Sequence, residues 1–293
     1  MIVTRSDGAL RLVQQVEHGR VAGALAAAWG NDAFAGLDLR PSVVTAAARH
    51  DEGWRAWDAR VLFNELERRP LHFLEIDASE HVRLYREGVE RVSLEDVYAG
   101  VLIGMHWTGL YRGRWARPGA AARVGRSAED RRLQDEVVAA EEQRWIGARQ
   151  AAWTADEPRS VFETRLWHHY DLLQLWDLLS LYLAVMPAEP SPPGAPVPWG
   201  PQLRELEHAA ESVTLPAVAV RPGGDRVPLT ASVRSHGEVT LHPFPFPGPT
   251  QVEVQQTVLL DRAWGPDEVA EKVRTTPTTV ATWRLVPGEG PEA

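Results

Sequence analysis

The stretch LLQLWDLLSLYL, residues 172–183, holds one charged side chain, Asp177, in a run otherwise suited to burial. A helix that is apolar on all sides is buried, so this segment predicts a buried helix. An unpaired carboxylate there would cost several kcal/mol or take up a proton. Asp177 therefore needs a positively charged partner, and the chain offers candidates for sharing a cation with it.

Three earlier positions could share that cation with Asp177. His18 lies in residues 16–29, whose spacing predicts a helix. The adjacent pair His50 and Asp51 ends a second predicted helix. Neighbours on a helix differ by about 100° around its axis, so both members of the pair can reach one ion if the helix runs beside it.

The predicted ligands are two imidazoles and two carboxylates: His18, His50, Asp51 and Asp177. Such donors suit Mn, Fe, Zn, Ni or Mg, and four of them leave positions open for water and substrate on an octahedral ion. Further residues are expected to contact substrate or support the ligands: Gln15, Trp54, His106, Tyr170 and Gln174. His106 could bind a second metal ion, transfer a proton or orient substrate, and the sequence does not choose among these roles.

Each of these residues alone has an ordinary structural explanation. A lone buried histidine is more often a hydrogen-bonded core residue than a ligand, and Asp177 could instead cap a helix or pair with an arginine. The joint pattern favours the metal interpretation.

The composition limits the compartment and the partners. The chain has 293 residues, a formal net charge of -9 and no cysteine, which excludes disulfides, thiolate metal sites and a cysteine nucleophile. The acidic balance argues against nucleic acid and anionic membranes as partners. The start of the chain has no signal-peptide pattern, and no apolar run reaches the roughly 20 residues of a membrane span. We expect a cytoplasmic protein that acts on a small molecule, and a homodimer stays open.

The hydrophobic periodicity changes along the chain and predicts an α+β fold class. Residues 1–186 predict a mainly helical domain that begins with a small hairpin, and the proline-rich residues 187–201 predict an extended linker. Residues 202–293 predict a small antiparallel β-rich domain with one short helix near residues 266–273.

Boundary signals mark several helices of the first part. Residues 93–96, SLED, have the pattern of a capping box at a helix start, and residues 127–130, SAED, repeat it before a charged helix. A long apolar helix is expected over residues 158–186, whereas residues 53–80 are expected to form loops and short turns.

The order of the predicted ligands resembles the H…HD…D signature of the HD superfamily of helical metal-dependent phosphohydrolases. Residues 50–54, HDEGW, are similar to its H-D-x-G-K segment, and residues 176–180, WDLLS, to its A-D-x-L-S ending. Over nearly its full length the chain also resembles a bacterial family of unknown function with Q-x-D-H, H-D-x-G-W and D-x-L-S-L-Y segments. The first of these is QVEH here, residues 15–18, with glutamate in place of aspartate.

This resemblance implies an HD-like fold and a metal-dependent hydrolase, with small phosphate esters among its substrates. Trp54 stands where HD hydrolases commonly have a lysine that is useful for binding phosphate, and Lys272 is the only lysine. Phosphate would then need arginines such as Arg55, Arg112 or Arg114.

Two other functions stay open. Some HD-fold proteins are diiron oxygenases with two further histidines before the last aspartate, and here His106 with His72 or His81 would supply them. Such an enzyme would act on a small aromatic or apolar substrate. A non-catalytic binding protein that retains the fold is the second alternative.

Overall fold

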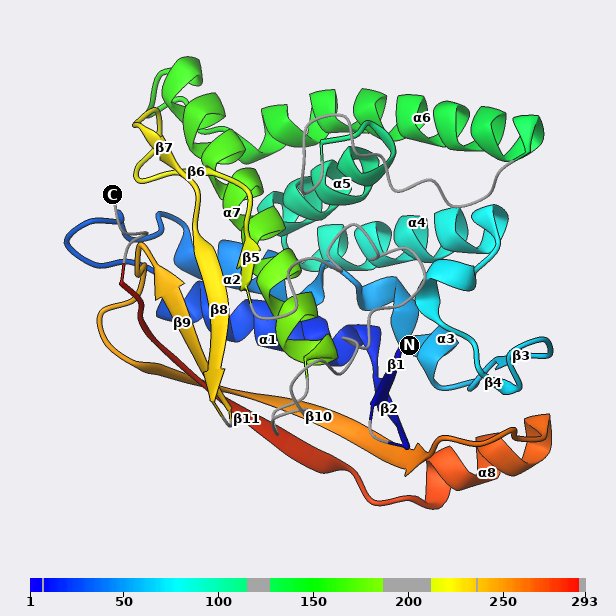
Figure 1. Ribbon diagram of the computed structural model, residues 1–293. Helices are drawn as coiled ribbons and strands as arrows, with labels where there is room; N and C mark the ends of the chain where they lie inside the picture. Colours follow the sequence, from blue (N-terminus) through cyan, green and yellow to red (C-terminus); the bar gives the residue numbers. More distant parts are fainter. Residues whose placement is uncertain (7, 115–126, 187–211, 236, 290–293) are drawn as a thin grey trace.

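The computed structural model describes residues 1–6, 8–114, 127–186, 212–235 and 237–289. Helices pack against a curled sheet in a mixed α and β arrangement (Figure 1). The predicted linker, residues 187–201, lies outside the described residues. In chain order the helices are α1 (Gln15–Ala28), α2 (Arg40–Arg49), α3 (Arg55–Asp58), α4 (Ala78–Glu95), α5 (Val97–Tyr111), α6 (Ala128–Ala152), α7 (Arg159–Val185) and α8 (Pro266–Thr275), with 3₁₀ turns η1 (Glu52–Trp54) and η2 (Phe73–Glu75).

Helix α7 packs against several other helices of the helical layer and is buried, as its apolar sequence predicts. Every residue from Leu172 to Met186 is buried, and α7 packs against α1, α2 and α5. Burial on all sides removes a large apolar surface from water, which stabilises the helix beyond its intrinsic propensity. Within the described residues, no helix combines the length and the hydropathy needed to cross a membrane.

One of the two predicted capping boxes is confirmed and the other is wrong. At the start of α6, Ser127 Oγ accepts a hydrogen bond from the backbone N–H of Asp130 at 2.9 Å, and the Asp130 carboxylate accepts one from Ser127 N–H at 3.1 Å. Ser93 instead lies in the last turns of α4. Helix α5 begins with Asp96, whose side chain accepts the N–H of Ala99 at 2.9 Å. An aspartate at the N-cap is sufficient here.

The main sheet has seven strands in the order β1-β2-β10-β11-β9-β8-β5. Their bounds are β1 (Ile2–Ser6), β2 (Ala9–Val13), β5 (Ser212–Thr214), β8 (Thr230–Ser235), β9 (Glu238–His242), β10 (Thr250–Leu260) and β11 (Thr279–Pro287). Two further pairs, β3 (Phe63–Asn64) with β4 (Arg69–Pro70) and β6 (Val218–Ala219) with β7 (Arg226–Val227), stand apart from it.

The sheet corrects the prediction of a small antiparallel β unit in two respects. The N-terminal hairpin is part of it, because β2 pairs antiparallel with β10, with Leu12 opposite Thr257. Strands β9 and β11 pair in parallel, with Val239 opposite Leu285. A parallel pair needs a crossover connection, and β10 and α8 supply it between these two strands.

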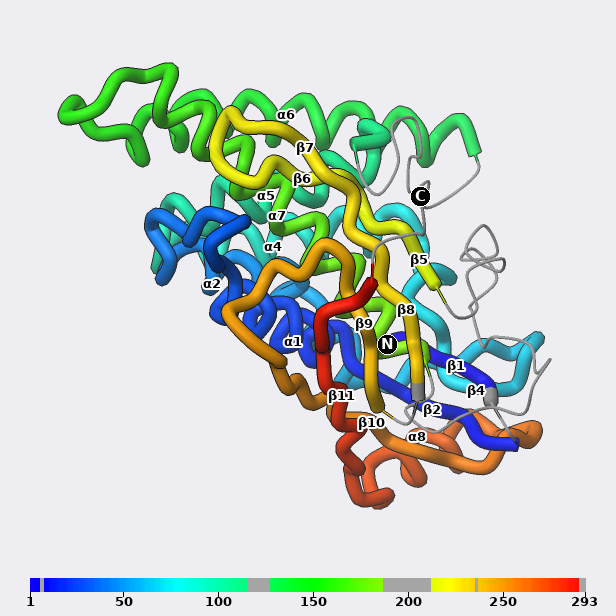
Figure 2. The backbone as a smooth tube through the Cα atoms, turned by 60° about the vertical axis from the view of Figure 1, so that its left-hand side comes forward, coloured from blue at the N-terminus to red at the C-terminus, as the bar shows by residue number. Residues whose placement is uncertain are grey.

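Polar contacts fasten the sheet to the helices. Arg11 of β2 donates hydrogen bonds to the carbonyl oxygens of Met186 at 3.3 Å and Val185 at 3.4 Å, at the C-terminal end of α7. Glu17 of α1 accepts the backbone N–H of Gln255 in β10 at 2.8 Å. Figure 2 shows β10 running beside α1. The sheet therefore contacts two of the helices that carry predicted ligands.

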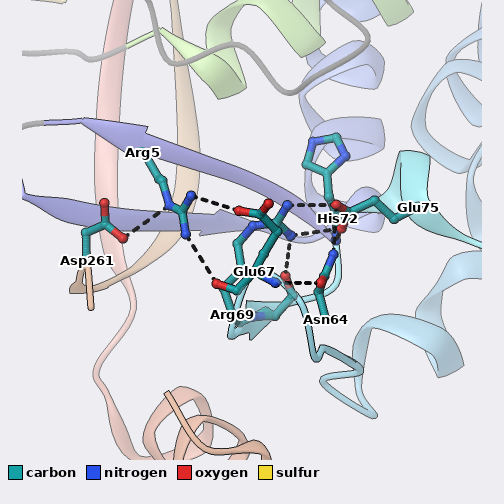
Figure 3. Close-up of polar contacts among 8 residues, drawn as sticks. Arg5, Asn64, Glu67, Arg69, His72, Glu75 and Asp261 are labelled. Atoms are coloured by element: carbon teal, nitrogen blue, oxygen red, sulfur yellow. Dashed lines mark hydrogen bonds and ion pairs between the residues drawn. The ribbon is translucent and has the colours of Figure 1, made fainter. Parts of the chain in front are cut away.

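Arg5 joins the small hairpin β3–β4 to the sheet, and Arg69 joins it to η2 (Figure 3). Arg5 of β1 donates to Glu67 and to Asp261, each at 3.2 Å. Arg69, 7 % exposed, makes two hydrogen bonds of 2.8 and 2.7 Å with Glu75. The segment expected to be loop thus contains ordered pairs that close one end of the helical layer.

Candidate metal centre

Three core helices bring the predicted ligands together. His18 lies in α1, His50 caps the C-terminal end of α2 with Asp51 directly after it, and Asp177 lies in α7. None of the four is more than 4 % exposed. Helices α1 and α2 approach closely because Gly19 has no side chain: a Cβ there would lie 2.9 Å from a backbone oxygen of α2.

One atom of each ligand faces the others. His18 Nε2 lies 3.1 Å from His50 Nε2 and 3.1 Å from Asp51 Oδ2. Asp177 Oδ1 lies 3.2 Å from His50 Nε2 and 3.5 Å from His18 Nε2. Atoms bound about 2.1 Å from a common ion lie roughly 3.0–3.4 Å apart. Ligand atoms of His18, His50 and Asp51 lie within 4.8 Å of one another, so these three residues have a spacing that a shared ion could use, and Asp177 lies beside both imidazoles.

Hydrogen bonds on the far side of each imidazole fix the position of its proton. The Ser180 hydroxyl donates to the Asp177 carbonyl oxygen at 2.8 Å, so His18 Nδ1–H donates to Ser180 Oγ at 2.7 Å. His50 Nδ1–H donates to a backbone carbonyl of α2 at 2.8 Å. Both Nε2 atoms thus direct lone pairs at the two carboxylates. Four acceptors this close repel one another unless a proton or a metal cation lies among them.

The protonation states follow from this crowding. Burial alone lowers the pKa of His50, but the charges of Asp51 and Asp177 outweigh it and raise that pKa to about 9. Burial opposes ionisation of Asp51 and Asp177, yet contacts with the histidines hold both pKa values below the ordinary aspartate value. A proton on His50 satisfies the group in the absence of metal, and a metal ion must displace it.

His106 of α5 extends the group. Its Nε2 lies 3.9 Å from Asp177 Oδ2, and its ring meets the His50 ring edge to face at 5.0 Å. Ligand atoms of His50, His106 and Asp177 lie within 4.8 Å of one another, which makes a second group that could hold a metal ion. Burial lowers the pKa of His106 to about 4. Among the described residues its Nδ1 has no hydrogen-bond partner, which is costly for a purely structural histidine.

His72 and His81 have other surroundings. The His72 Nδ1 accepts the N–H of Leu74 at 3.2 Å, and burial lowers the pKa of His72 to about 3. The neutral ring therefore carries its proton on Nε2, which leaves no lone pair for a metal. His81 Nδ1 is hydrogen-bonded to the Tyr111 hydroxyl. In the described part of the chain, neither histidine joins a ligand group.

Aromatic rings form one wall beside the ligands. Trp54, in η1, packs edge to face against His81 at 5.5 Å and Tyr85 at 6.2 Å, and Tyr85 stacks on Trp107 at 5.9 Å. Burial, together with the charges of Asp51 and Asp177, raises the pKa of Tyr85, because its hydroxyl lies near both carboxylates. Sequence reasoning missed Tyr85, for which no motif gave a signal. Ser180 lies in the D-x-L-S segment, but the sequence assigns it no role.

The remaining predicted residues lie at different distances from the ligands. Gln15 is buried in the first turn of α1, and its side-chain oxygen has no partner among the described residues. Gln174 is buried one turn before Asp177. The Tyr170 hydroxyl lies over Gly109 of α5, so that a Cβ there would be 2.0 Å away. Seven residues separate Tyr170 from Asp177, about 10 Å along the helix.

Gly53 is needed for close packing. A Cβ on it would lie 1.8 Å from the carbonyl oxygen of Leu84, because η1 crosses α4 with backbone against backbone. The glycine of the H-D-x-G segment therefore holds Asp51 and Trp54 against α4. Its φ angle is not among the positive values in the described chain, so a tight left-handed turn is not its role.

The arginines expected to bind phosphate are paired with carboxylates. Arg55 donates to Glu52 at 3.3 and 3.1 Å. Arg112 makes two hydrogen bonds with Glu142 at 3.1 and 2.9 Å, and Arg114 lies 3.6 Å from the same carboxylate. These pairs reduce the positive charge available to an anionic substrate.

A family model matches most of the chain. The family is described as "Protein of unknown function (DUF3891)", and the match covers residues 1–261. That range includes the three helices and the His–Asp pair that form the ligand group, and it extends through β10. Searches of curated proteins and of solved structures found no match. The chain belongs to the DUF3891 family of proteins of unknown function.

Proposed function

We propose that the protein is a metal-dependent hydrolase of HD-like type that binds one divalent ion through His18, His50, Asp51 and Asp177. One observation carries this proposal. The two imidazole Nε2 atoms lie 3.1 Å from each other and 3.1 to 3.7 Å from two carboxylate oxygens in a buried position, with each Nδ1 proton engaged elsewhere. The H…HD…D order of the ligands along the chain supports the same assignment.

The residues around the ligands suit hydrolysis. A bound divalent ion supplies Lewis acidity, which lowers the pKa of a water molecule and polarises the group to be cleaved. Ser180 and the carbonyl of Ala47 hold the two imidazoles in place. His106 is neutral at pH 7, because its pKa is lowered to about 4, and its unpaired Nδ1 can contact substrate or water. These are the features of a preorganised site.

The substrate we propose is a small molecule, and a phosphate ester is one class that HD-like chemistry would take. Arg55 and Arg112 are held by glutamates, so the ion itself would have to balance much of the charge of a phosphate. Carboxylic esters and amides need no such cation. An assay panel should therefore include both classes.

A diiron oxygenase is the second candidate, and the second ligand group favours it. His50, His106 and Asp177 could hold a further ion while sharing two ligands with the first. Metal stoichiometry separates the two functions, because the hydrolase proposed above needs one ion and this oxygenase needs two.

Elemental analysis of protein purified without a histidine tag tests the proposal. We expect one divalent ion per chain, its loss in Asp51→Asn, and its retention in Glu141→Gln. Glu141 is a matched control because it is a buried carboxylate, 8 % exposed, that is paired with Arg144. Hydrolysis of phosphate or carboxylic esters should stop with chelator and return with metal. Protein that holds no metal after incubation with Mn, Fe, Zn, Ni and Mg in turn would refute the proposal and favour the non-catalytic alternative.

A further inference from the structure

A second site is formed by a cavity of about 480 Å³ between the helical layer and the sheet. Its walls come from α1, α3, the end of α2 and the strand β10, which runs beside α1 in Figure 2. Ligand pockets for small molecules typically measure roughly 300–1,000 Å³. The polar part of the lining includes Gln14, Glu17, Arg20, Arg55, Gln256 and Thr278.

Two guanidinium groups line this α1–β10 cavity from different helices. Arg20 directs Nε and Nη2 to Glu17 at 2.9 and 2.8 Å, and Arg55 directs the same two atoms to Glu52. Both glutamate side chains are buried, whereas the arginine side chains are 46 % and 61 % exposed. Within the described residues, Nη1 of each arginine has no acceptor at hydrogen-bond distance. Each guanidinium is thus fixed by its glutamate and keeps donors available.

The lining is rich in hydrogen-bonding groups. Glu17 balances the charge of Arg20 and Glu52 that of Arg55, so the two arginines offer hydrogen-bond donors in fixed positions rather than an excess of positive charge. Side-chain amides and hydroxyls, such as those of Gln256 and Thr278, can bind the polar groups of a larger molecule. Fixed guanidinium donors are well suited to carboxylate and phosphate oxygens.

The cavity is separate from the candidate metal centre. Ala48 lines it, and the same residue presses against α1, where a Cβ on Gly19 would lie 2.9 Å from the Ala48 carbonyl oxygen and 3.8 Å from His50 Cε1. This contact leaves no room for a side chain between the helices. None of the four proposed metal ligands lines the cavity.

We propose that the α1–β10 cavity binds a small polar molecule bearing a phosphate or carboxylate group, with Arg20 and Arg55 as its anion-binding residues. Binding there does not need a metal ion, so this inference stands or falls independently of the hydrolase.

Thermal unfolding of the full chain, treated with EDTA, tests the proposal. Inorganic phosphate and, separately, citrate are titrated at constant ionic strength set with NaCl. We expect a saturable rise in Tm for at least one of them, since a ligand that binds only the native state stabilises it. A response to phosphate alone identifies a phosphate group, and a response to citrate alone a carboxylate. A response to neither overturns the proposal.

Substitutions of residues that line the cavity test whether the anion binds there. Arg20→Gln and Arg55→Gln should each raise the half-saturating concentration at least tenfold. Arg83→Gln is the matched control, because Arg83 is also 46 % exposed and also pairs with a glutamate three residues away, and it should leave that concentration unchanged. Thr278→Val, in an exposed lining residue, should weaken binding severalfold and serves if Arg20→Gln does not fold. Unchanged binding in all lining variants, or its loss in Asp51→Asn, would place the anion elsewhere and reject the site.

Discussion

Metal affinity should rise steeply with pH, because a metal ion and a proton compete for His50. The charges of Asp51 and Asp177 raise the pKa of this buried imidazole to about 9, so the metal-free protein holds a proton there at pH 7. The proton occupies Nε2, the atom that faces the other three ligands. Binding of a divalent ion therefore has to release it.

The size of the effect follows from that pKa. With a value of about 9, about 1 % of the His50 rings are deprotonated at pH 7 and about 9 % at pH 8. Apparent affinity scales with this fraction, so it should increase about ninefold from pH 7 to pH 8. The stability of the metal-free protein changes in the opposite direction and falls as the pH rises. The folded pKa lies above the unfolded value of 6.5, so the proton stabilises metal-free protein fully below pH 6.5, and this contribution is lost as the pH rises through 9.

Calorimetric titration with Mn²⁺ at pH 7 and pH 8 measures the apparent affinity at each pH. Repeating it in HEPES and Tris, which differ in ionisation enthalpy, should show close to one proton released per ion at pH 7. His106→Gln serves as a control and should keep the same pH dependence, because the pKa of His106 is already lowered to about 4. An affinity that changes less than twofold between the two pH values, or binding without proton release, would show that His50 is not a protonated ligand.

Three substitutions test the packing and polarity of the same region. Ser180→Ala removes the acceptor of His18 Nδ1–H and should weaken Mn²⁺ binding roughly 10–100-fold, measured by calorimetry, whereas Ser232→Ala on β8 should not. Gly53→Ala places a Cβ 1.8 Å from the Leu84 carbonyl and should destabilise the fold by about 3 kcal/mol or more. Gly147→Ala in α6 is the control, because a Cβ there meets nothing within 4 Å, and it should stabilise the fold by about 1 kcal/mol. Urea denaturation measures both variants, and equal changes in the free energy of unfolding would reject the packing role of Gly53. Asp177→Asn should abolish metal binding and lower the pKa of His50 in an NMR titration, and an unchanged His50 would mean that Asp177 does not control it.

The ligand residues could be predicted because their chemistry conflicts with their surroundings. A carboxylate in the apolar run of α7 needs a cation, and His18, His50 and Asp51 were the suitable partners on helices of clear periodicity. The structure places His18, His50 and Asp51 in one group and Asp177 beside both imidazoles, in a second group with His50 and His106. Residues without such a conflict were harder to find. Tyr85 looks like an ordinary aromatic core residue in sequence, and only the packing of α4 against η1, which follows Asp51 directly, places it near that carboxylate.

Helix α4 shows a signal that was present but overlooked. Its buried residues include Val82, Tyr85, Val89 and Val92, which follow the three- and four-residue spacing of a helix face. The capping-box pattern at residues 93–96 indicates a helix start, whereas α4 ends at Glu95 and α5 begins at Val97. A short polar motif matches by chance more often than a sustained periodicity does, so the longer pattern was the better guide.

The topology of the sheet had no comparable signal in the sequence. Pairing of β2 with β10 joins residues near position 12 to residues near position 257, and alternation within each strand says nothing about its partner. The sheet nevertheless bears on the site. Arg11 holds the C-terminal end of α7, and Glu17 joins α1 to β10 one residue before His18. His18 and Asp177 come from these two helices, so the strands at both ends of the chain help fix the distance between ligands that would otherwise repel each other.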